Sequence, residues 1–174
     1  MRLVATPLEG VMLVEQERLG DERGFFARTY DVELLAPIAQ MSTSFSPRAG
    51  TLRGLHLQRE PHGETKLVRC TRGAIFDVAV DLRQQSATLH GWFGVELSAD
   101  NGRALLIGPG FAHGFQTLLD DTEVLYAIDA PYVGAAASGV RWDDPAFGID
   151  WPDPPPGGRT MSDRDAAYPD VGGA

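Results

Sequence analysis

Cysteine is almost absent from this chain of 174 residues, because Cys70 is the only one. With a single thiol no intramolecular disulfide can form, which fits a reducing compartment. The first residues lack the apolar segment of a signal peptide, and no run approaches the roughly 18 apolar residues that a membrane helix requires. The sequence therefore predicts a soluble, cytoplasmic protein that does not enter a membrane.

Positive charge is also scarce. The chain has 15 Lys and Arg residues against 24 Asp and Glu residues, for a formal net charge of −9. A nucleic-acid partner is not expected, because binding to the phosphate backbone requires a basic face. Local charge can still differ from the total. Cations are concentrated in one short stretch that contains Arg48, Arg53, Arg59, Lys66, Arg69 and Arg72. They allow a cationic pocket for a small anion, although any one of these arginines could equally be a solvated surface charge.

The length and the 43% hydrophobic content are those of one globular domain. We therefore treat residues 1–174 as a single domain. Proline is concentrated at residues 152–158 (PDPPPGG), which predicts a rigid, extended connector. The polar residues that follow are expected to pack on the body, so that residues 152–174 form a C-terminal extension of the barrel.

Short runs of β-forming residues, separated by Gly, Pro and Asp turns, dominate the chain. Their connections are too short for parallel crossovers, so we expect an antiparallel sandwich or barrel. Strands are expected at residues 11–14, 25–30, 75–82, 92–97, 103–107, 111–118 and 122–128, a loop or edge strand at 42–50, and a helix at 33–39 that ends near Pro37. In the strand at 75–82, alternation predicts one buried face, with Asp77 and Asp81 on the opposite face.

The stretch at residues 51–70 (TLRGLHLQREPHGETKLVRC) carries the densest set of candidate functional residues. On a strand, His56 and Gln58 share one face because side chains alternate. Lys66 opens the next strand, after a turn at residues 59–63 that contains Pro and Gly. A His, a Gln and a Lys on the lining of a small barrel are costly to bury, so their convergence favours a polar ligand.

His56 is the first candidate for catalysis, because an imidazole with a carboxylate behind it acts as a general base near neutral pH. A structural histidine is the alternative. His113, in Gly-Phe-Ala-His-Gly-Phe, raises a metal site as a further possibility, with Glu64 as a carboxylate ligand. Against it, metal-binding double-stranded β-helix proteins usually carry His-x-His where this chain has His56-x-Gln58, and Lys66 would add positive charge beside the cation. Tyr126 is either a core tyrosine or a proton donor.

Seven blocks run in order through nearly the whole chain: GDERGFF at 20–26, LRGLHLQ at 52–58, KLVR at 66–69, FDVAVDLR at 76–83, GFAHGF at 110–115, RWDDP at 141–145 and GIDWP at 148–152. Together these blocks resemble the dTDP-4-dehydrorhamnose 3,5-epimerases, a cupin-fold family of nucleotide-sugar epimerases. The resemblance implies an all-β fold, a double-stranded β-helix (jelly roll) with a few short helices.

The resemblance also implies roles for individual residues. His56 falls on the catalytic base, Tyr126 on the opposing acid, Lys66 beside the sugar carbonyl, and Asp165 on the acid that partners the histidine. Nucleotide-sugar contacts are implied for Arg23, Arg53, His113 and Arg164, with Tyr132 stacking on the nucleobase. Gln58 joins this substrate-binding set because it shares a face with His56.

The implied reaction is epimerisation at C3 and C5 of a dTDP-linked 4-keto-6-deoxyhexose by a homodimeric isomerase without metal or redox cofactor. Proton loss beside the carbonyl gives an enolate, which Lys66 would stabilise. Three alternatives stay open: an epimerase acting at C3 or C5 alone, a metal-dependent cupin oxygenase, and a non-catalytic nucleotide-sugar binder.

Several positions depart from the family pattern. Arg28 and Ala137 stand where many members carry Glu, and residues 41–46 lack the usual Gln-x-Asn-x-Ser run. By the resemblance, all of these positions lie on the nucleotide side of the site. The identity of the nucleobase and of the sugar is therefore left open. Arg53 and His56 are three residues apart and would face opposite sides of a regular strand. Either a β-bulge intervenes or Arg53 serves a different subsite.

Overall fold

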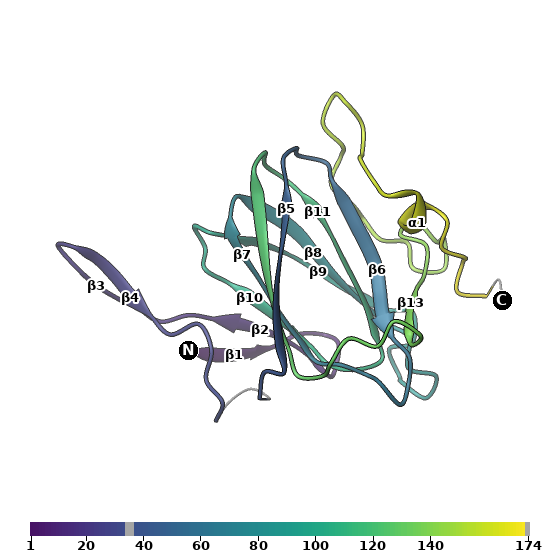
Figure 1. Cartoon of the computed structure of the whole chain (residues 1–174), viewed down its shortest axis with the longest axis horizontal. Helices are drawn as coiled ribbons and strands as arrows, with labels where there is room; N and C mark the ends of the chain where they lie inside the picture. The colour runs from purple at the N-terminus through teal and green to yellow at the C-terminus, as the bar shows by residue number, and fades with distance from the viewer. Residues whose placement is uncertain (34–36, 173–174) are drawn as a thin grey trace.

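The computed structural model describes residues 1–33 and 37–172 and shows two antiparallel sheets that face each other, with a separate hairpin at one side (Figure 1). The first sheet has the strand order β1-β2-β10-β7-β12-β5, and the second has the order β13-β6-β11-β8-β9. The strands are β1 (Arg2–Ala5), β2 (Val11–Glu15), β3 (Arg18–Asp21), β4 (Gly24–Ala27), β5 (Gln40–Ser46), β6 (Leu52–Gln58), β7 (Lys66–Arg72), β8 (Ala74–Asp81), β9 (Trp92–Ser98), β10 (Ala104–Ile107), β11 (Phe111–Thr117), β12 (Thr122–Ile128) and β13 (Ala137–Gly139). The prediction of an all-β jelly roll is confirmed.

The main core fills the space between the two sheets. It contains Val68 and Cys70 from β7, Ile75 from β8 and Phe115 from β11, all at most 1% exposed. Each sheet contributes one face to this core. A polar cavity, which is described below, occupies another part of the space between the sheets.

A second cluster covers the outer face of the five-stranded sheet. Val78 and Val80 of β8 and Ala112 of β11 pack there against Phe147, which belongs to the segment after β13. The prediction that β8 has one buried face was therefore wrong. Asp77 and Asp81, expected on the exposed side, are fully buried, because that side faces the interior between the sheets while the other is covered by the C-terminal segment.

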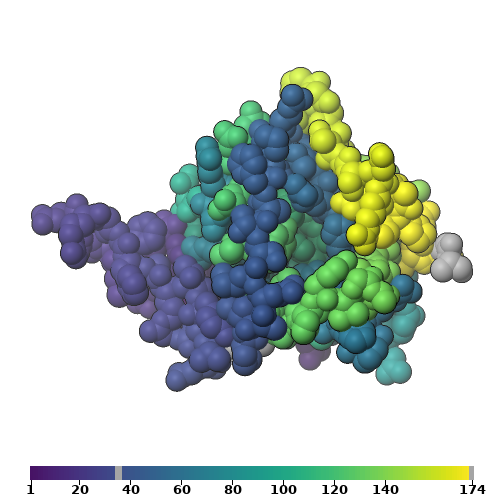
Figure 2. All heavy atoms as spheres, in the orientation of Figure 1, coloured from purple at the N-terminus to yellow at the C-terminus, as the bar shows by residue number. Residues whose placement is uncertain are grey.

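The hairpin β3–β4 forms an arm that projects from the body (Figures 1 and 2). The predicted strand at residues 25–30 is shorter than expected and ends at Ala27. Leu19, Phe25 and Phe26 on this arm are 63%, 58% and 72% exposed. Such exposed apolar side chains, on a hairpin that does not pack on its own barrel, are typical of a surface that is covered by another molecule.

Two local predictions have different outcomes. Residues 42–50 were expected as a loop or an edge strand, and β5 is an edge strand of the first sheet. The helix expected at residues 33–39 has its centre at residues 34–36, outside the described part, and no helix is present at Glu33 or at residues 37–39. Among the described residues the only helix is α1 (Asp163–Ala166), so no helix there is long and apolar enough to cross a membrane.

The C-terminal segment runs back across the five-stranded sheet to β6. Trp151 donates from Nε1 to the backbone oxygen of Trp142 at 2.9 Å, and Thr160 forms a β-bridge with Thr51, directly before β6. The helix α1 follows at once and contacts β6. This route places the side chains of α1 beside the middle of β6, more than a hundred residues earlier in the sequence.

Candidate active site

A β-bulge in β6 sets the direction of the first two site residues. His56 pairs with His113 of β11, but Arg53 pairs with Phe115, so three steps on β6 match two steps on β11. Both Arg53 and His56 consequently line one cavity. Gly54 lies at the bulge with a φ of +129°, and a Cβ there would lie 2.6 Å from the Cα of Gly114. Of the two alternatives left by the sequence, the bulge is the correct one.

The imidazole of His56 is held by Asp165 of α1. The Nε2 atom of His56 lies 2.9 Å from Oδ1 of Asp165, and the other oxygen, Oδ2, accepts from the backbone N–H of Gly54 at 3.1 Å. Ser162 caps the helix and accepts from the backbone N–H of Asp165 at 3.1 Å. With Asp165 ionised, Nε2 carries the proton, and Nδ1 is left as the basic nitrogen.

Burial lowers the pKa of His56 from its ordinary value of 6.5. The negative charge and hydrogen bond of Asp165 act in the opposite direction, whereas the nearby Lys66 and His113 reinforce the decrease. At neutral pH the imidazole is therefore neutral and able to accept a proton.

A second imidazole–carboxylate pair lies beside the first. Nε2 of His113 lies 2.8 Å from Oδ1 of Asp77, and both side chains are buried. Burial raises the pKa of Asp77, and the interaction with His113 offsets part of that increase. The remaining oxygen of Asp77, Oδ2, is buried and has no hydrogen-bond partner within the described residues.

Tyr126 comes from β12 in the opposite sheet and lines the same cavity as His56. Its ring meets that of His113 edge-on, with the centroids 6.3 Å apart, and its hydroxyl lies 3.5 Å from Oγ of Ser44. Burial raises the pKa of Tyr126 above its ordinary value of 10, so the phenol remains protonated at neutral pH. A base and a proton donor thus lie on different sheets around one space.

Lys66, the first residue of β7, contributes an ammonium to this space. Its Nζ atom lies 3.0 Å from Oε1 of Glu64 and 3.4 Å from the backbone oxygen of His56. Gln58 is 4% exposed, and its amide is engaged with protein groups, including Glu64 at 2.8 Å. Its role in substrate binding stays a prediction.

The cavity has a volume of about 690 Å³, within the usual range for small-molecule sites. The opening is bordered by residues of β5, of the segment after β12 and of the C-terminal segment, which meet on the face seen in Figure 2. Arg53, Arg164 and the 61% exposed Tyr132 are among the residues that line the cavity. Of the six cations noted in the sequence, only Arg53 and Lys66 line the cavity.

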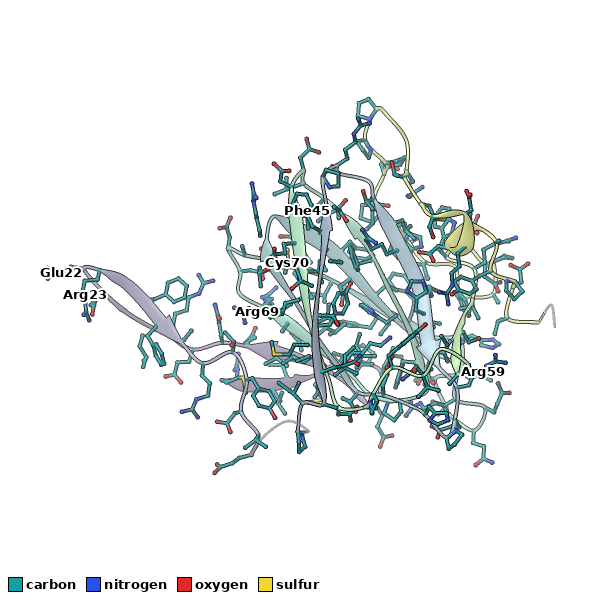
Figure 3. The ribbon with its side chains drawn as sticks, viewed as in Figure 1. Glu22, Arg23, Phe45, Arg59, Arg69 and Cys70 are labelled. Atoms are coloured by element: carbon teal, nitrogen blue, oxygen red, sulfur yellow. The ribbon has the colours of Figure 1, made fainter. Side chains whose placement is uncertain are left out.

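Arg23 lies elsewhere. It is at the tip of the arm, next to Glu22 and away from the barrel (Figure 3), and its Nε donates to Asp21 at 3.1 Å. Within a single chain it is not part of the cavity lining.

The side chains that could bind a metal ion do not converge on one point. His56 and His113 each pair with their own aspartate, and Glu64 pairs with Lys66. Across residues 1–33 and 37–172, no three His, Cys, Asp or Glu side chains are grouped so that they could hold a metal. The geometry therefore gives the metal-dependent oxygenase no support.

Sequence reasoning missed two residues of this site. Asp77 was assigned to the exposed face of its strand, and Glu64 was considered only as a metal ligand. In the register of β8 and β11, Asp77 pairs with Phe115 and His113 with Ala79, so Asp77 reaches His113 diagonally across the two strands. This placement depends on the pairing of the strands, which the sequence does not encode locally. Glu64 lies in the connection two residues before Lys66, the first residue of β7, and this i, i+2 spacing was the available signal.

Comparison with known proteins agrees with this arrangement. A profile of the dTDP-4-dehydrorhamnose 3,5-epimerase family matches residues 5–172. Over 167 residues, the chain is 42% identical to dTDP-4-dehydrorhamnose 3,5-epimerase of Sinorhizobium fredii, covering 92% of this chain and 85% of that protein. It is 38% identical over 159 residues to dTDP-4-dehydrorhamnose 3-epimerase of Streptomyces niveus, covering 87% of this chain and 76% of that protein.

The fold is also similar to that of a solved structure. The crystal structure of dTDP-4-dehydrorhamnose 3,5-epimerase from Bacillus anthracis, with TDP and PPi bound, matches with a TM-score of 0.92 and 41% identity. The match covers 98% of this chain and 99% of that one. The order of the sequence blocks, the jelly roll and the cavity around His56 lead to one conclusion: the chain belongs to the dTDP-4-dehydrorhamnose 3,5-epimerase family.

Proposed function

We propose that this protein epimerises dTDP-4-dehydro-6-deoxyglucose at C3 and C5 to give dTDP-4-dehydrorhamnose. The observation that carries the proposal is that His56 and Tyr126, from opposite sheets, line one cavity together with Lys66. A base on one side of a sugar ring and an acid on the other are what inversion of a carbon centre requires. The family relationship gives the class of substrate.

In the first step, Nδ1 of His56 removes the proton from C3 or C5. The electron pair of the broken C–H bond moves toward C4, and the ketone oxygen becomes an enolate oxygen. Asp165 holds the ring in the required tautomer and stabilises the imidazolium that forms. The ammonium of Lys66 donates a hydrogen bond to the oxygen on which negative charge develops.

In the second step, the phenol of Tyr126 delivers a proton to the same carbon from the opposite face. The electron pair returns from the enolate to carbon, and the configuration is inverted. Support for this role comes from the position of Tyr126, on the sheet opposite His56 and on the lining of the same cavity. Proton exchange with solvent then returns His56 and Tyr126 to their starting states.

The nucleotide part of the substrate is assigned to the opening of the cavity. Arg53 and Arg164 supply positive charge for the diphosphate, and the exposed ring of Tyr132 offers a surface on which a base can stack. His113 is assigned a contact with the sugar because it lies on the cavity wall beside Tyr126.

We further propose that the enzyme is a homodimer in which the arm of one protomer reaches the cavity of its partner. The support is the exposure of Leu19, Phe25 and Phe26 on an arm that stands clear of its own barrel. If each arm reaches the cavity of the other protomer, Arg23 at the tip of the arm lies near the nucleotide bound there.

Product analysis by proton NMR tests the function. Incubation of the protein with dTDP-4-dehydro-6-deoxyglucose is expected to give the L-rhamno product, inverted at both C3 and C5. Inversion at C3 alone would instead match the activity named for the Streptomyces niveus relative. No change in any nucleotide-linked 4-keto sugar would refute the proposal.

A further inference from the structure

The surroundings of Lys66 use two of the three N–H donors of its ammonium. Nζ lies 3.0 Å from Oε1 of Glu64 and 3.4 Å from the backbone oxygen of His56. The Lys66 and Glu64 side chains are only 11% and 8% exposed. No further hydrogen bond from Nζ is formed to any residue in the described ranges, so one N–H is left for the cavity.

Glu64 is itself held in one orientation. Its second oxygen, Oε2, accepts from Nε2 of Gln58 at 2.8 Å. The same Nε2 lies 3.2 Å from the backbone oxygens of His62 and Pro131, and Oε1 of Gln58 accepts from the backbone N–H of Val133 at 2.6 Å. The Gln58 amide thus ties the turn after β6 to the segment after β12, with Glu64 between this amide and Lys66.

Two functions of the Glu64 carboxylate are physically distinct. It could merely neutralise a buried ammonium, since an unpaired charge in this setting is costly. It could also fix the direction in which the ammonium donates. A carboxylate that serves only for neutralisation needs to be close to the charge, but it does not need a second contact that fixes its own orientation. The contact between Oε2 and Gln58, added to the contact between Oε1 and Lys66, favours the second function.

We propose that Glu64, oriented by Gln58, is a positioning residue that directs the free N–H of Lys66 toward the ketone oxygen of the substrate. The inference rests on the proposed epimerase function and deepens it. Since the direction of the donor is set before substrate binds, no reorganisation is needed when negative charge develops on that oxygen. Glu64 therefore acts on the rate of enolate formation and not on the affinity for the nucleotide.

The experiment compares the variants Glu64→Gln, Glu64→Asp and Lys66→Met, and the double variant Glu64→Gln/Lys66→Met. The readouts are kcat, KM, the rates of deuterium incorporation at C3 and C5, and the Kd for dTDP. The change Glu60→Gln is the matched control, because Glu60 is an exposed carboxylate on the same connection between β6 and β7. The dTDP affinity also reports whether each variant is folded.

We expect Glu64→Gln to lower kcat by about 10- to 100-fold, with KM and the dTDP Kd changed by less than about twofold. Glu64→Asp keeps the charge but shortens the side chain, so it is also expected to be slow. If Glu64→Gln does not fold, Glu64→Asp carries the test. The double variant is expected to be no slower than Lys66→Met alone, because Glu64 acts through Lys66. Glu60→Gln is expected to match the wild type.

Three results would overturn the inference while leaving the proposed function intact: wild-type kcat in Glu64→Gln, full activity in Glu64→Asp, or a loss that adds to that of Lys66→Met. A wild-type protein that incorporates no deuterium would instead refute the proposed function, and the role of Glu64 with it.

Discussion

His56 and His113 lie directly opposite each other on β6 and β11, and each imidazole pairs with a different aspartate. His56 and Asp165 are 109 positions apart in the sequence, and Asp165 belongs to α1. His113 and Asp77 are 36 positions apart and lie on adjacent strands of the five-stranded sheet. The two pairs have different environments, because the His56 side chain is 41% exposed and the His113 side chain is 5% exposed. The more open pair is suited to exchange protons with substrate and solvent.

The pH profile tests the assignment of His56 as the base. Its pKa lies below 6.5, so kcat/KM should fall only when the pH decreases through that lowered pKa, since the protonated imidazole cannot accept a proton. In Asp165→Asn, the carboxylate that favours the imidazolium is lost. The acid limb of the profile should therefore move to still lower pH, while the maximum rate falls by about 10²- to 10⁴-fold.

The measurement is kcat/KM between about pH 4 and pH 9, the range that brackets an ordinary or lowered histidine pKa. A shift of the acid limb to higher pH in Asp165→Asn would contradict the electrostatic role given to Asp165. An unchanged limb would show that His56 does not control it.

Tyr126→Phe should separate the two proton transfers. The base can still remove protons, but the donor on the opposite face is absent. We expect the inverted product to form at least about 10²-fold more slowly, while the starting sugar continues to exchange hydrogen for deuterium with retained configuration. Mass spectrometry and NMR of the recovered substrate in D₂O measure both rates. Loss of exchange and inversion to the same extent would mean that Tyr126 serves proton removal as well.

Mixed dimers test the exchange of the arm. Arg23→Ala and His56→Asn homodimers should both be weakly active. A heterodimer contains one site with an intact His56 and, from the partner, an intact Arg23. Refolding an equal mixture should therefore restore about a quarter of the wild-type activity, since half of the dimers are mixed and each has one complete site. No restoration would place Arg23 in the function of its own protomer, or outside the site.

The bulge in β6 should be sensitive to a single methyl group. Gly54→Ala adds a Cβ at 2.6 Å from the backbone of Gly114 and forces alanine into a positive φ. We expect the free energy of unfolding to decrease by about 2 to 4 kcal/mol, together with a loss of activity as Arg53 and His56 turn apart. Gly157→Ala is the control, because nothing lies within 4 Å of its added Cβ. Urea unfolding measures both, and equal stability of the two variants would contradict this reading of the bulge.

Local patterns predicted most of the strands, because alternation and turn residues act over a few positions. The convergence of His56 and Lys66 followed from the same rules. The bulge that turns Arg53 inward did not, since it depends on the close approach of Gly54 and Gly114 from two strands. Asp77 was misjudged for a related reason. A strand covered on both faces shows no difference in burial between its alternate positions, and a buried carboxylate is stabilised by His113 of the neighbouring strand.

The C-terminal segment shows a second feature that local sequence patterns do not predict. Asp165 was identified by resemblance alone, because nothing in the polar run around it indicates that it returns to β6. In the structure, the bridge between Thr51 and Thr160 fixes that return, and the cap of Ser162 sets the start of α1. Contacts of this kind arise from the folded chain and leave no periodic signal in the sequence.

The most direct test of the account follows the hydrogens at C3 and C5 of dTDP-4-dehydro-6-deoxyglucose in D₂O by proton NMR. With the wild-type protein, both signals should disappear as deuterium enters with inversion, and His56→Asn should slow both losses by about 10²- to 10⁴-fold while still binding dTDP. Retention of both hydrogens in the presence of folded wild-type protein, or undiminished exchange in His56→Asn, would contradict it.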